Sequence, residues 1–391
     1  MLPPHTDRNG LNSFNFFYPT SRSQRMPANK FQLVLTRPGF AEIAVEEFRD
    51  RLNLQGHVVG PAAVAFDENI QLPKLSASVF ARQLMPRAVH FAVSSPSKVD
   101  DMLHGIISAI VKRLEVLSKR ANRQAMPWTL HAFALDDDPA TALALRIEKL
   151  LLAALKTRLP RLYARYIPEL PVVDTQDLGD GASSMINNTL LVQVYVATVN
   201  DVWFSTASLG EGPSRFIGGN QRMRHFPGAP SRSSSKLEEA LLLLGHAPKS
   251  GDTAIDLGAA PGGWTFTLVR HGASVTAIDH GALKLPNNKK FTELVTHLKE
   301  NGLTYRPHAP VDWVVCDMLV GSRETLAVLE RWLSQGWAKN FVFNVKLPQA
   351  KPWPAIREAL DLLARYPWAI MQAKHLFHDR QEITLMGAER V

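Results

Sequence analysis

Cysteine is almost absent from this sequence, and so are long apolar runs. Cys316 is the one cysteine among 391 residues, so neither an intramolecular disulfide nor a cysteine-based zinc site can form. The longest apolar runs, such as residues 241–244, are far shorter than the roughly 20 residues that a membrane-spanning helix needs. These absences predict a protein of the reducing cytoplasm with no membrane partner.

The charge is strongly positive. The formal net charge is +8 and the isoelectric point is near 9.6, which favours a polyanionic partner, although many basic proteins never bind nucleic acid. Basic residues gather between residues 98 and 169, where the alternative is an ordinary solvated helix face. They include Lys112, Arg113, Lys119, Arg120, Arg123, Lys156, Arg158, Arg161 and Arg165.

Residues 1–30 show no signal-peptide pattern. We expect a disordered extension or a misassigned start, with Met26 as a plausible beginning. Residues 31–97 then alternate between strand and helix patterns, which indicates a ferredoxin-like α+β unit. The expected strands are 31–35, 58–66 and 89–93, and the expected helices are 41–52 and 75–84.

A second α+β unit is expected over residues 98–209. Its predicted helices are 99–118 and 140–159, and its predicted strands are 128–135 and 188–199, the latter being one arm of a possible hairpin. Residues 210–230 are rich in glycine, proline and arginine and lack periodicity, so we expect a linker.

From residue 231 to 391 helices and strands alternate regularly, which predicts an α/β domain with a doubly wound, mostly parallel sheet. The chain would end in an antiparallel hairpin of residues 370–377 and 382–386. The other expected strands are 253–257, 275–278, 311–316 and 341–345, and the expected helices are 237–244, 264–270, 291–301, 324–335 and 353–364.

The most specific motif is the glycine-rich loop of residues 256–265, at a strand-to-helix junction. Glycine there lets the backbone turn tightly and approach a ligand. The loop lacks the third glycine of the dinucleotide fingerprint, and Pro261 removes an amide donor. We therefore expect a ligand without a pyrophosphate, with Asp256 accepting hydrogen bonds from a cationic amino-acid group. An ordinary glycine-rich turn is the alternative.

Asp279 ends the next expected strand, about twenty residues beyond the glycine loop, where doubly wound folds place a carboxylate that binds ribose hydroxyls. Without the glycine loop, Asp279 would be taken for a loop aspartate.

Four further charged residues stand at the ends of expected elements. Because the carboxyl ends of parallel strands form the ligand crevice, Asp317 and Lys346 are expected to converge there. Lys236 precedes the helix before the glycine loop, and Glu382 begins the last expected strand. Each residue alone is more typical of a surface charge, but the shared position indicates a catalytic group.

The glycine loop and these four charges together resemble the FtsJ-type ribose 2′-O-methyltransferases and their Lys-Asp-Lys-Glu tetrad. The segments 231–239, 315–318, 344–348 and 378–380 are similar to the RlmM-type subfamily, and the likeness reaches residues 37–40 and 80–83. The resemblance implies methylation of a cytidine ribose in bacterial 23S rRNA or a precursor particle, with a THUMP RNA-binding unit before the catalytic domain.

The cofactor that the resemblance implies is S-adenosylmethionine, and no metal is expected. Asn301 stands where the family commonly has an acidic residue, but its amide oxygen can still accept a hydrogen bond from adenine. The expected cofactor-binding residues are Ser233, Asp256, Gly258, Ala260, Pro261, Gly262, Gly263, Trp264, Asp279, Asn301 and Asp317.

A ribose hydroxyl is a weak nucleophile and needs a base. We assign Lys346 as the base, Asp317 and Glu382 as orienting carboxylates, and Lys236 as electrostatic support. Burial and a nearby cation would lower the pKa of the base, and the two carboxylates would oppose that shift.

Two alternative functions stay open from the sequence. A base methyltransferase would share the cofactor fold, but residues 317–320 lack the Asn-Pro-Pro-Tyr motif of amino-group methylation. Cysteine-dependent base methylation would need a reactive Cys316, which is expected inside an apolar strand. A non-catalytic RNA-binding protein is the second alternative, and the intact tetrad counts against it.

Overall fold

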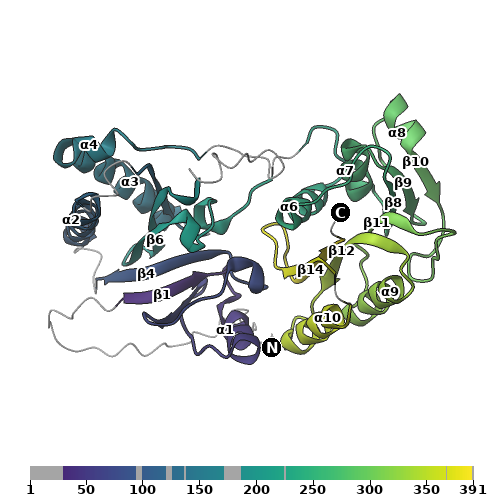
Figure 1. Ribbon diagram of the computed structural model, residues 1–391, viewed down its shortest axis with the longest axis horizontal. Coiled ribbons are helices and arrows are strands. Elements are labelled where there is room, and N and C mark those ends of the chain that lie inside the picture. The colour runs from purple at the N-terminus through teal and green to yellow at the C-terminus, as the bar shows by residue number, and fades with distance from the viewer. Residues whose placement is uncertain are drawn as a thin grey trace, which may run out of the picture.

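The computed structural model describes residues 30–93, 99–119, 126–135, 138–170, 186–223, 226–366 and 368–389. Within these ranges the chain forms two seven-stranded sheets, one in each half (Figure 1). Of the extension expected at residues 1–30, only Lys30 belongs to the described residues. Arg120 and Arg123 also lie outside them. None of the helices in the described ranges is long and apolar enough to span a membrane.

The amino-terminal half is a mixed, largely antiparallel sheet in the order β2-β3-β1-β4-β7-β6-β5. Only the β5–β6 pair is parallel. Its elements are β1 (Lys30–Leu35), α1 (Ala41–Leu52), β2 (His57–Gly60), β3 (Ala63–Asp67), β4 (Gln83–Ala92), α2 (Val99–Ser118), β5 (Trp128–Phe133), α3 (Asp138–Arg158), α4 (Pro160–Tyr163), β6 (Leu190–Thr198) and β7 (Asp201–Ser208).

The expected boundary between residues 97 and 98 lies outside the described residues, but β4 before it pairs with β7 after it, so one sheet spans both expected units. Helices α2 and α3 bury their apolar faces against the β5, β6 and β7 side of the sheet, at the left of Figure 1. The bounds predicted for α2 are confirmed. Strand β6 was predicted, but strand β7 was not. The two strands form a hairpin.

Two sequence predictions for residues 31–97 are wrong. The expected strand 58–66 is a hairpin of β2 and β3, because residues 61 and 62 form a turn between them. The expected helix 75–84 is a single 3-10 turn, Leu75–Ala77, followed by the start of β4 at Gln83. The element order is therefore β-α-β-β-β rather than the expected β-α-β-α-β.

The carboxyl-terminal half confirms the predicted α/β class. Its sheet has the order β10-β9-β8-β11-β12-β14-β13, and only β14 runs opposite to the other strands. Its elements are α6 (Ser234–Leu244), β8 (Thr253–Leu257), α7 (Gly263–His271), β9 (Ser274–Ile278), α8 (Lys289–Leu294), β10 (Val295–Leu298), β11 (Val311–Cys316), α9 (Ser322–Ser334), β12 (Ala338–Lys346), α10 (Trp353–Arg365), β13 (Ile370–Lys374) and β14 (Glu382–Ala388).

The predicted helix 291–301 is half wrong. Helix α8 ends at Leu294, and the next four residues form β10, which pairs in parallel with β9. The threonine and valine of this segment favour extended backbone, and the open edge of β9 supplies its hydrogen-bond partners. Asn301 consequently follows a strand rather than a helix.

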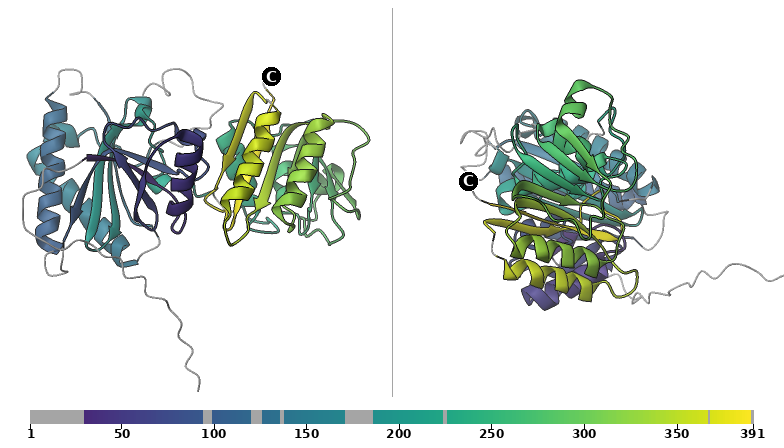
Figure 2. Two further views of the ribbon diagram at one scale, coloured as in Figure 1. Left: turned by 90° about the horizontal axis from the view of Figure 1, so that it is seen from below. Right: turned by 90° about the vertical axis from the view of Figure 1, so that its right-hand side faces the viewer.

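Helices α6 and α7 cover one face of this sheet, and α9 and α10 cover the other (Figure 1). Helix α10 also lies beside α1 of the amino-terminal half, as both views show (Figures 1 and 2). The Trp353 indole nitrogen donates to the Asp50 carboxylate at 2.8 Å across this contact. Buried residues of α1, including Phe48, belong to the same apolar cluster as Phe341 and Ile356.

Residues 75–81 of the amino-terminal half lie at this contact, and Glu47 of α1 holds this segment in place. Its fully buried carboxylate accepts the Ser78 hydroxyl at 2.8 Å and the backbone N–H groups of Val79 at 2.7 Å and Phe80 at 3.2 Å. Arg51, one helical turn on, donates to the same carboxylate at 2.7 Å. Because the predicted helix 75–84 does not form, its N–H groups need other acceptors, and Glu47 supplies them.

Glu47→Ala is expected to destabilise the fold by about 3 kcal/mol, because it leaves buried N–H donors without an acceptor. Urea unfolding should show this as a lower midpoint, while Glu42→Ala, an exposed glutamate of the same helix, should leave the midpoint nearly unchanged. Equal midpoints for the two variants would show that residues 78–80 are held by other contacts.

Candidate active site

The predicted glycine loop connects β8 to α7 in a conformation that requires glycine. Gly258 and Gly262 have φ values of +79° and +112°, a region that side chains disfavour. A Cβ atom on Gly258 would stand 2.5 Å from Met318, and one on Gly262 would stand 2.9 Å from Leu285. Neighbouring side chains of the protein therefore pack against both glycines, and the approach of a ligand to this loop stays a prediction.

Ser231 and Ser233 lie directly against the start of α7. Their hydroxyl oxygens are 2.6 Å apart, and a Cβ atom on Gly263 would collide with both. Trp264, predicted to bind cofactor, is instead a buried core residue whose indole nitrogen donates to the Ser233 carbonyl at 3.0 Å. It fixes the serine segment against the loop.

Asp256, at the end of β8, is completely buried and accepts the Thr265 hydroxyl at 2.6 Å. Burial raises the pKa of Asp256 to about 7, and the nearby charges of Asp317 and Asp279 add to the shift. A cation placed beside this carboxyl would favour its ionised form.

Asp279, at the end of β9, ties two loops together. Its carboxylate accepts the N–H of Ala260 at 3.0 Å and that of Gly281 at 2.7 Å. Pro261 accepts the Lys284 N–H at 2.8 Å, so the glycine loop is held against residues 279–285. Each Asp279 oxygen keeps a second lone pair for another donor.

Asn301 is exposed beyond β10, and its amide oxygen accepts the Leu303 N–H at 2.9 Å. A Cβ atom on the next residue, Gly302, would stand 2.9 Å from the Met318 sulfur and 3.6 Å from the Gly258 nitrogen. The loop that carries Asn301 thus borders the glycine loop, and adenine contact by Asn301 stays a prediction.

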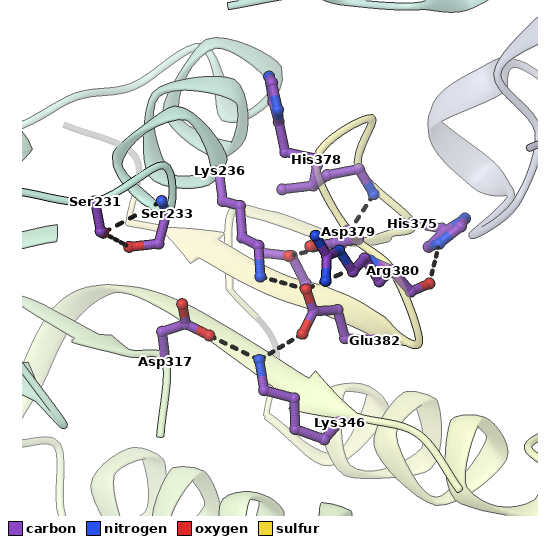
Figure 3. A network of polar contacts seen from close by, with 12 residues as sticks. Ser231, Ser233, Lys236, Asp317, Lys346, His375, His378, Asp379, Arg380 and Glu382 are labelled. Atoms are coloured by element: carbon purple, nitrogen blue, oxygen red, sulfur yellow. Dashed lines mark hydrogen bonds and ion pairs between the residues drawn. The ribbon is translucent and has the colours of Figure 1, made fainter. Parts of the chain in front are cut away.

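The four charged residues of the tetrad converge into one network (Figure 3). The Lys346 ammonium donates to Asp317 at 2.9 Å and also to Glu382. Lys236 donates to the other Glu382 oxygen. Lys346 and Glu382 are direct partners in the antiparallel β12–β14 register, Asp317 follows β11, and Lys236 projects from the first turn of α6.

The network fixes the charges of its members. Burial alone would raise the pKa of Glu382, but the charge and hydrogen bond of Lys236, joined by Lys346, lower it to about 2. Burial would likewise lower the pKa of Lys346, but Asp317 and Glu382 outweigh it and the net pKa lies above the ordinary value. In this state Lys346 is an ammonium ion.

Cys316 lies where the sequence predicted, fully buried in β11. Burial raises the pKa of its thiol to about 12. A thiol that neither ionises nor reaches the surface cannot act as a nucleophile at neutral pH.

Three residues of this site lie in segments that the sequence singled out, but no role was predicted for them. Thr265 holds Asp256, Met318 packs on Gly258, and Glu239 accepts the backbone N–H groups of Phe377 at 2.7 Å and His378 at 3.3 Å. Thr265 and Met318 adjoin predicted site residues in the sequence, which was a usable signal. Glu239 ends the segment 231–239, but its partners lie nearly 140 positions away along the chain, so its role could not be predicted.

Part of the chain matches a known methyltransferase family and proteins of similar sequence. Residues 229–346 match the FtsJ-like methyltransferase family. The chain is similar to proteins named ribosomal RNA large subunit methyltransferase M. The identity is 37% over 204 residues in Thauera aminoaromatica, covering 50% of this chain and 55% of that protein.

A second such relative, from Xanthomonas euvesicatoria, is 43% identical over 177 residues, covering 43% of this chain and 50% of that protein. The chain thus spans about half the length of the curated relatives it matches. Among solved structures, TrmN from Thermus thermophilus aligns over 92% of this chain and 99% of its own length, at 15% identity and a TM-score of 0.35.

Lys236→Met should raise the pKa of the Glu382 carboxyl from about 2, because it removes the cation that contributes most to its ionisation. Carbon-13 NMR titration of the glutamate carboxyl groups measures this directly. Lys249→Met, an exposed lysine beyond α6, should leave the titration unchanged. An unaltered Glu382 titration in the Lys236 variant would mean that Lys346 alone sets its charge.

Proposed function

We propose that this protein is an S-adenosylmethionine-dependent methyltransferase acting on a ribose 2′-hydroxyl of RNA, namely a cytidine of bacterial 23S rRNA. The observation that carries the proposal is the network of Lys236, Glu382, Lys346 and Asp317 beside the glycine loop. The family match and the names of the similar proteins point to the same chemistry.

The residues around the glycine loop fit S-adenosylmethionine. Asp256 suits an ammonium group, and Asp279 keeps lone pairs for ribose hydroxyls. Gly258 and Gly262 give the loop the positive φ values that its tight turn requires. Bound there, S-adenosylmethionine would supply an electrophilic methyl group. The remaining predicted contacts are Ser233, Ala260, Pro261, Gly263, Asn301 and Asp317, with Trp264 acting through Ser233.

Lys346 is the proposed base for the ribose hydroxyl. Its nitrogen must first give up a proton, since the two carboxylates keep it charged in the present state. Those carboxylates also fix the position of the nitrogen. A fixed position matters because a general base must lie within hydrogen-bonding distance of the proton that it removes. Lys236 neutralises Glu382 and so limits the negative charge around Lys346.

The proposed RNA-binding surface is the basic end of helices α2, α3 and α4. Arg158, Arg161 and Arg165 are all exposed, and the charges of Lys112, Lys119 and Arg158 all act on Glu115 of α2. Such a cluster suits the phosphates of folded RNA without base-specific contacts. This supports recognition of RNA shape by the amino-terminal half.

The proposal is tested by incubating the purified protein with methyl-labelled S-adenosylmethionine and 23S rRNA from cells that lack the modification. A 2′-O-methyl group blocks alkaline cleavage of the next phosphodiester, so the label should appear in an alkali-resistant dinucleotide containing cytidine. Label in mononucleotides would indicate base methylation instead. Cofactor binding without transfer to any rRNA would indicate a non-catalytic RNA-binding protein.

Lys346→Met should lower the rate of methyl transfer by about a thousandfold, within the range that a general base contributes. Affinity for S-adenosylmethionine, measured by calorimetry, should stay within a few-fold of wild type. Lys339→Met provides the control, because Lys339 lies on the same strand in an exposed ion pair with Asp312. Activity of the Lys346 variant within tenfold of wild type would refute its assignment as the base.

Affinity for S-adenosylmethionine should fall by about tenfold for each pH unit below about 7, the pKa of Asp256 in the unliganded protein. Below that pH the carboxyl must release a proton before it can face an ammonium group; above it, no proton is released. Calorimetry in buffers of different ionisation enthalpy measures both the affinity and the number of protons released on binding. Asp256→Asn should bind weakly without this slope, and a flat wild-type profile would contradict the contact.

Reversing the charges of Arg158, Arg161 and Arg165 to glutamate should weaken binding to 23S rRNA and flatten its dependence on salt, since fewer phosphates are neutralised. Filter binding at several salt concentrations gives the slope. An unchanged slope would make this cluster a solvated helix face and move the RNA-binding surface elsewhere.

A further inference from the structure

The turn that leads into Glu382 is held by the amino-terminal half of the protein. This β13–β14 turn, residues 375–381, connects Lys374 to Glu382. His375 begins it, and its backbone N–H donates to the Val79 carbonyl at 2.9 Å. The His375 ring packs on Phe40, with ring centroids 4.1 Å apart. The turn thus starts inside the contact between the two halves.

Two arginines of the amino-terminal half bind the carbonyl groups of the turn. Arg82 donates from one guanidinium nitrogen to the carbonyls of His375, at 3.3 Å, and Leu376. Arg37 donates to the carbonyl of Asp379. Arg82 is only 9% exposed, so its charge-assisted hydrogen bonds are shielded from water and strong.

The strand before the turn is fixed in the same way. The ammonium group of Lys374 donates to the carbonyls of Leu75 at 2.8 Å, Ser78 at 2.6 Å and Ala81 at 3.0 Å. Lys374 is buried, and all three acceptors belong to the segment that Glu47 holds. This end of β13 is therefore bonded to the amino-terminal half.

The opposite side of the turn is bound within the carboxyl-terminal half. Glu239 accepts the N–H groups of Phe377 and His378, and Asp379 accepts that of Leu376 at 2.9 Å. The turn ends next to the tetrad (Figure 3): the Arg380 N–H lies 3.4 Å from Glu382, and the Arg380 carbonyl bonds the His375 ring at 3.0 Å.

We propose that the amino-terminal half completes the candidate active site, with Arg82 and Arg37 as positioning residues that place Glu382 between Lys236 and Lys346 by fixing the β13–β14 turn. The inference rests on the proposed methyltransferase function. It gives the amino-terminal half a role in the chemical step that is separate from RNA binding.

The charge of Lys346 supplies a specific readout. The titratable groups that face Lys346 are Asp317, Glu382 and the buried Cys316 thiol. Those that face Glu382 are Lys236, Lys346, the buried Asp379 and the buried His375 ring. Glu382 raises the pKa of Lys346. A displaced Glu382 therefore lowers that pKa, and the rise of rate with pH should then occur at lower pH. Simple loss of folded protein would lower the rate without moving the profile.

The experiment compares Arg82→Met with Arg365→Met in the full-length protein. Arg365 forms an exposed ion pair with Glu330 at the far end of α10, so its loss should be nearly neutral. Single-turnover methyl transfer is measured at saturating S-adenosylmethionine and 23S rRNA, which removes any effect on affinity. The Arg82 variant should lose about tenfold or more in maximal rate and shift its profile to lower pH. Arg82→Lys should restore part of both.

Hydrogen exchange of the amides in residues 375–381 tests the same contact without any activity. Exchange should be faster in the Arg82→Met variant and unchanged in the control. Arg37→Met, at a partly exposed position, is the second variant if Arg82→Met does not fold.

Suppose that the wild type is active and that the Arg82 and Arg365 variants have the same rate, pH profile and amide exchange. This result would overturn the inference and leave the proposed function standing. A wild type that methylates no RNA would overturn the proposed function. The amide exchange would then still decide whether Arg82 holds the turn.

Discussion

The shared carboxylate of Glu382 is the interaction on which the rest of the site depends. Two ammonium groups, those of Lys236 and Lys346, could not stand so close without an anion between them. The antiparallel register of β12 and β14 sets Lys346 opposite Glu382, and the first turn of α6 brings Lys236 over them. The strand order of the sheet thus determines the charge pattern of the site.

Much of this site could be predicted from the sequence because it lies at strand ends. In a doubly wound sheet the carboxyl ends of parallel strands share one edge, so Asp317, Lys346 and the glycine loop had to meet there. Short strands such as β8 and β11 are also mostly apolar and buried, and their bounds were predicted correctly. Local pattern and global position agree in this half.

The errors fall where long-range contacts override local pattern. Apolar spacing over residues 75–84 suggested a helix, but Glu47 and Lys374 take up the backbone groups of that segment from opposite sides. Strand β10 follows the open edge of β9 rather than the helical pattern of its own residues. The contact between the halves could not be predicted from the sequence either. Arg82 and Lys374 are isolated charged residues, and each lies nearly 300 positions from its partners along the chain.

The network carries a physical conflict that bears on the chemistry. The carboxylates that hold the Lys346 nitrogen in place also keep it protonated, so precise position and basicity oppose each other. Bound positive charge and exclusion of water both favour the neutral amine. If Lys346 is the base that we propose, its nitrogen becomes basic only when such a change in its surroundings occurs. Because Glu382 bonds both lysines, whatever fixes Glu382 also influences the pH at which Lys346 could act as the proposed base.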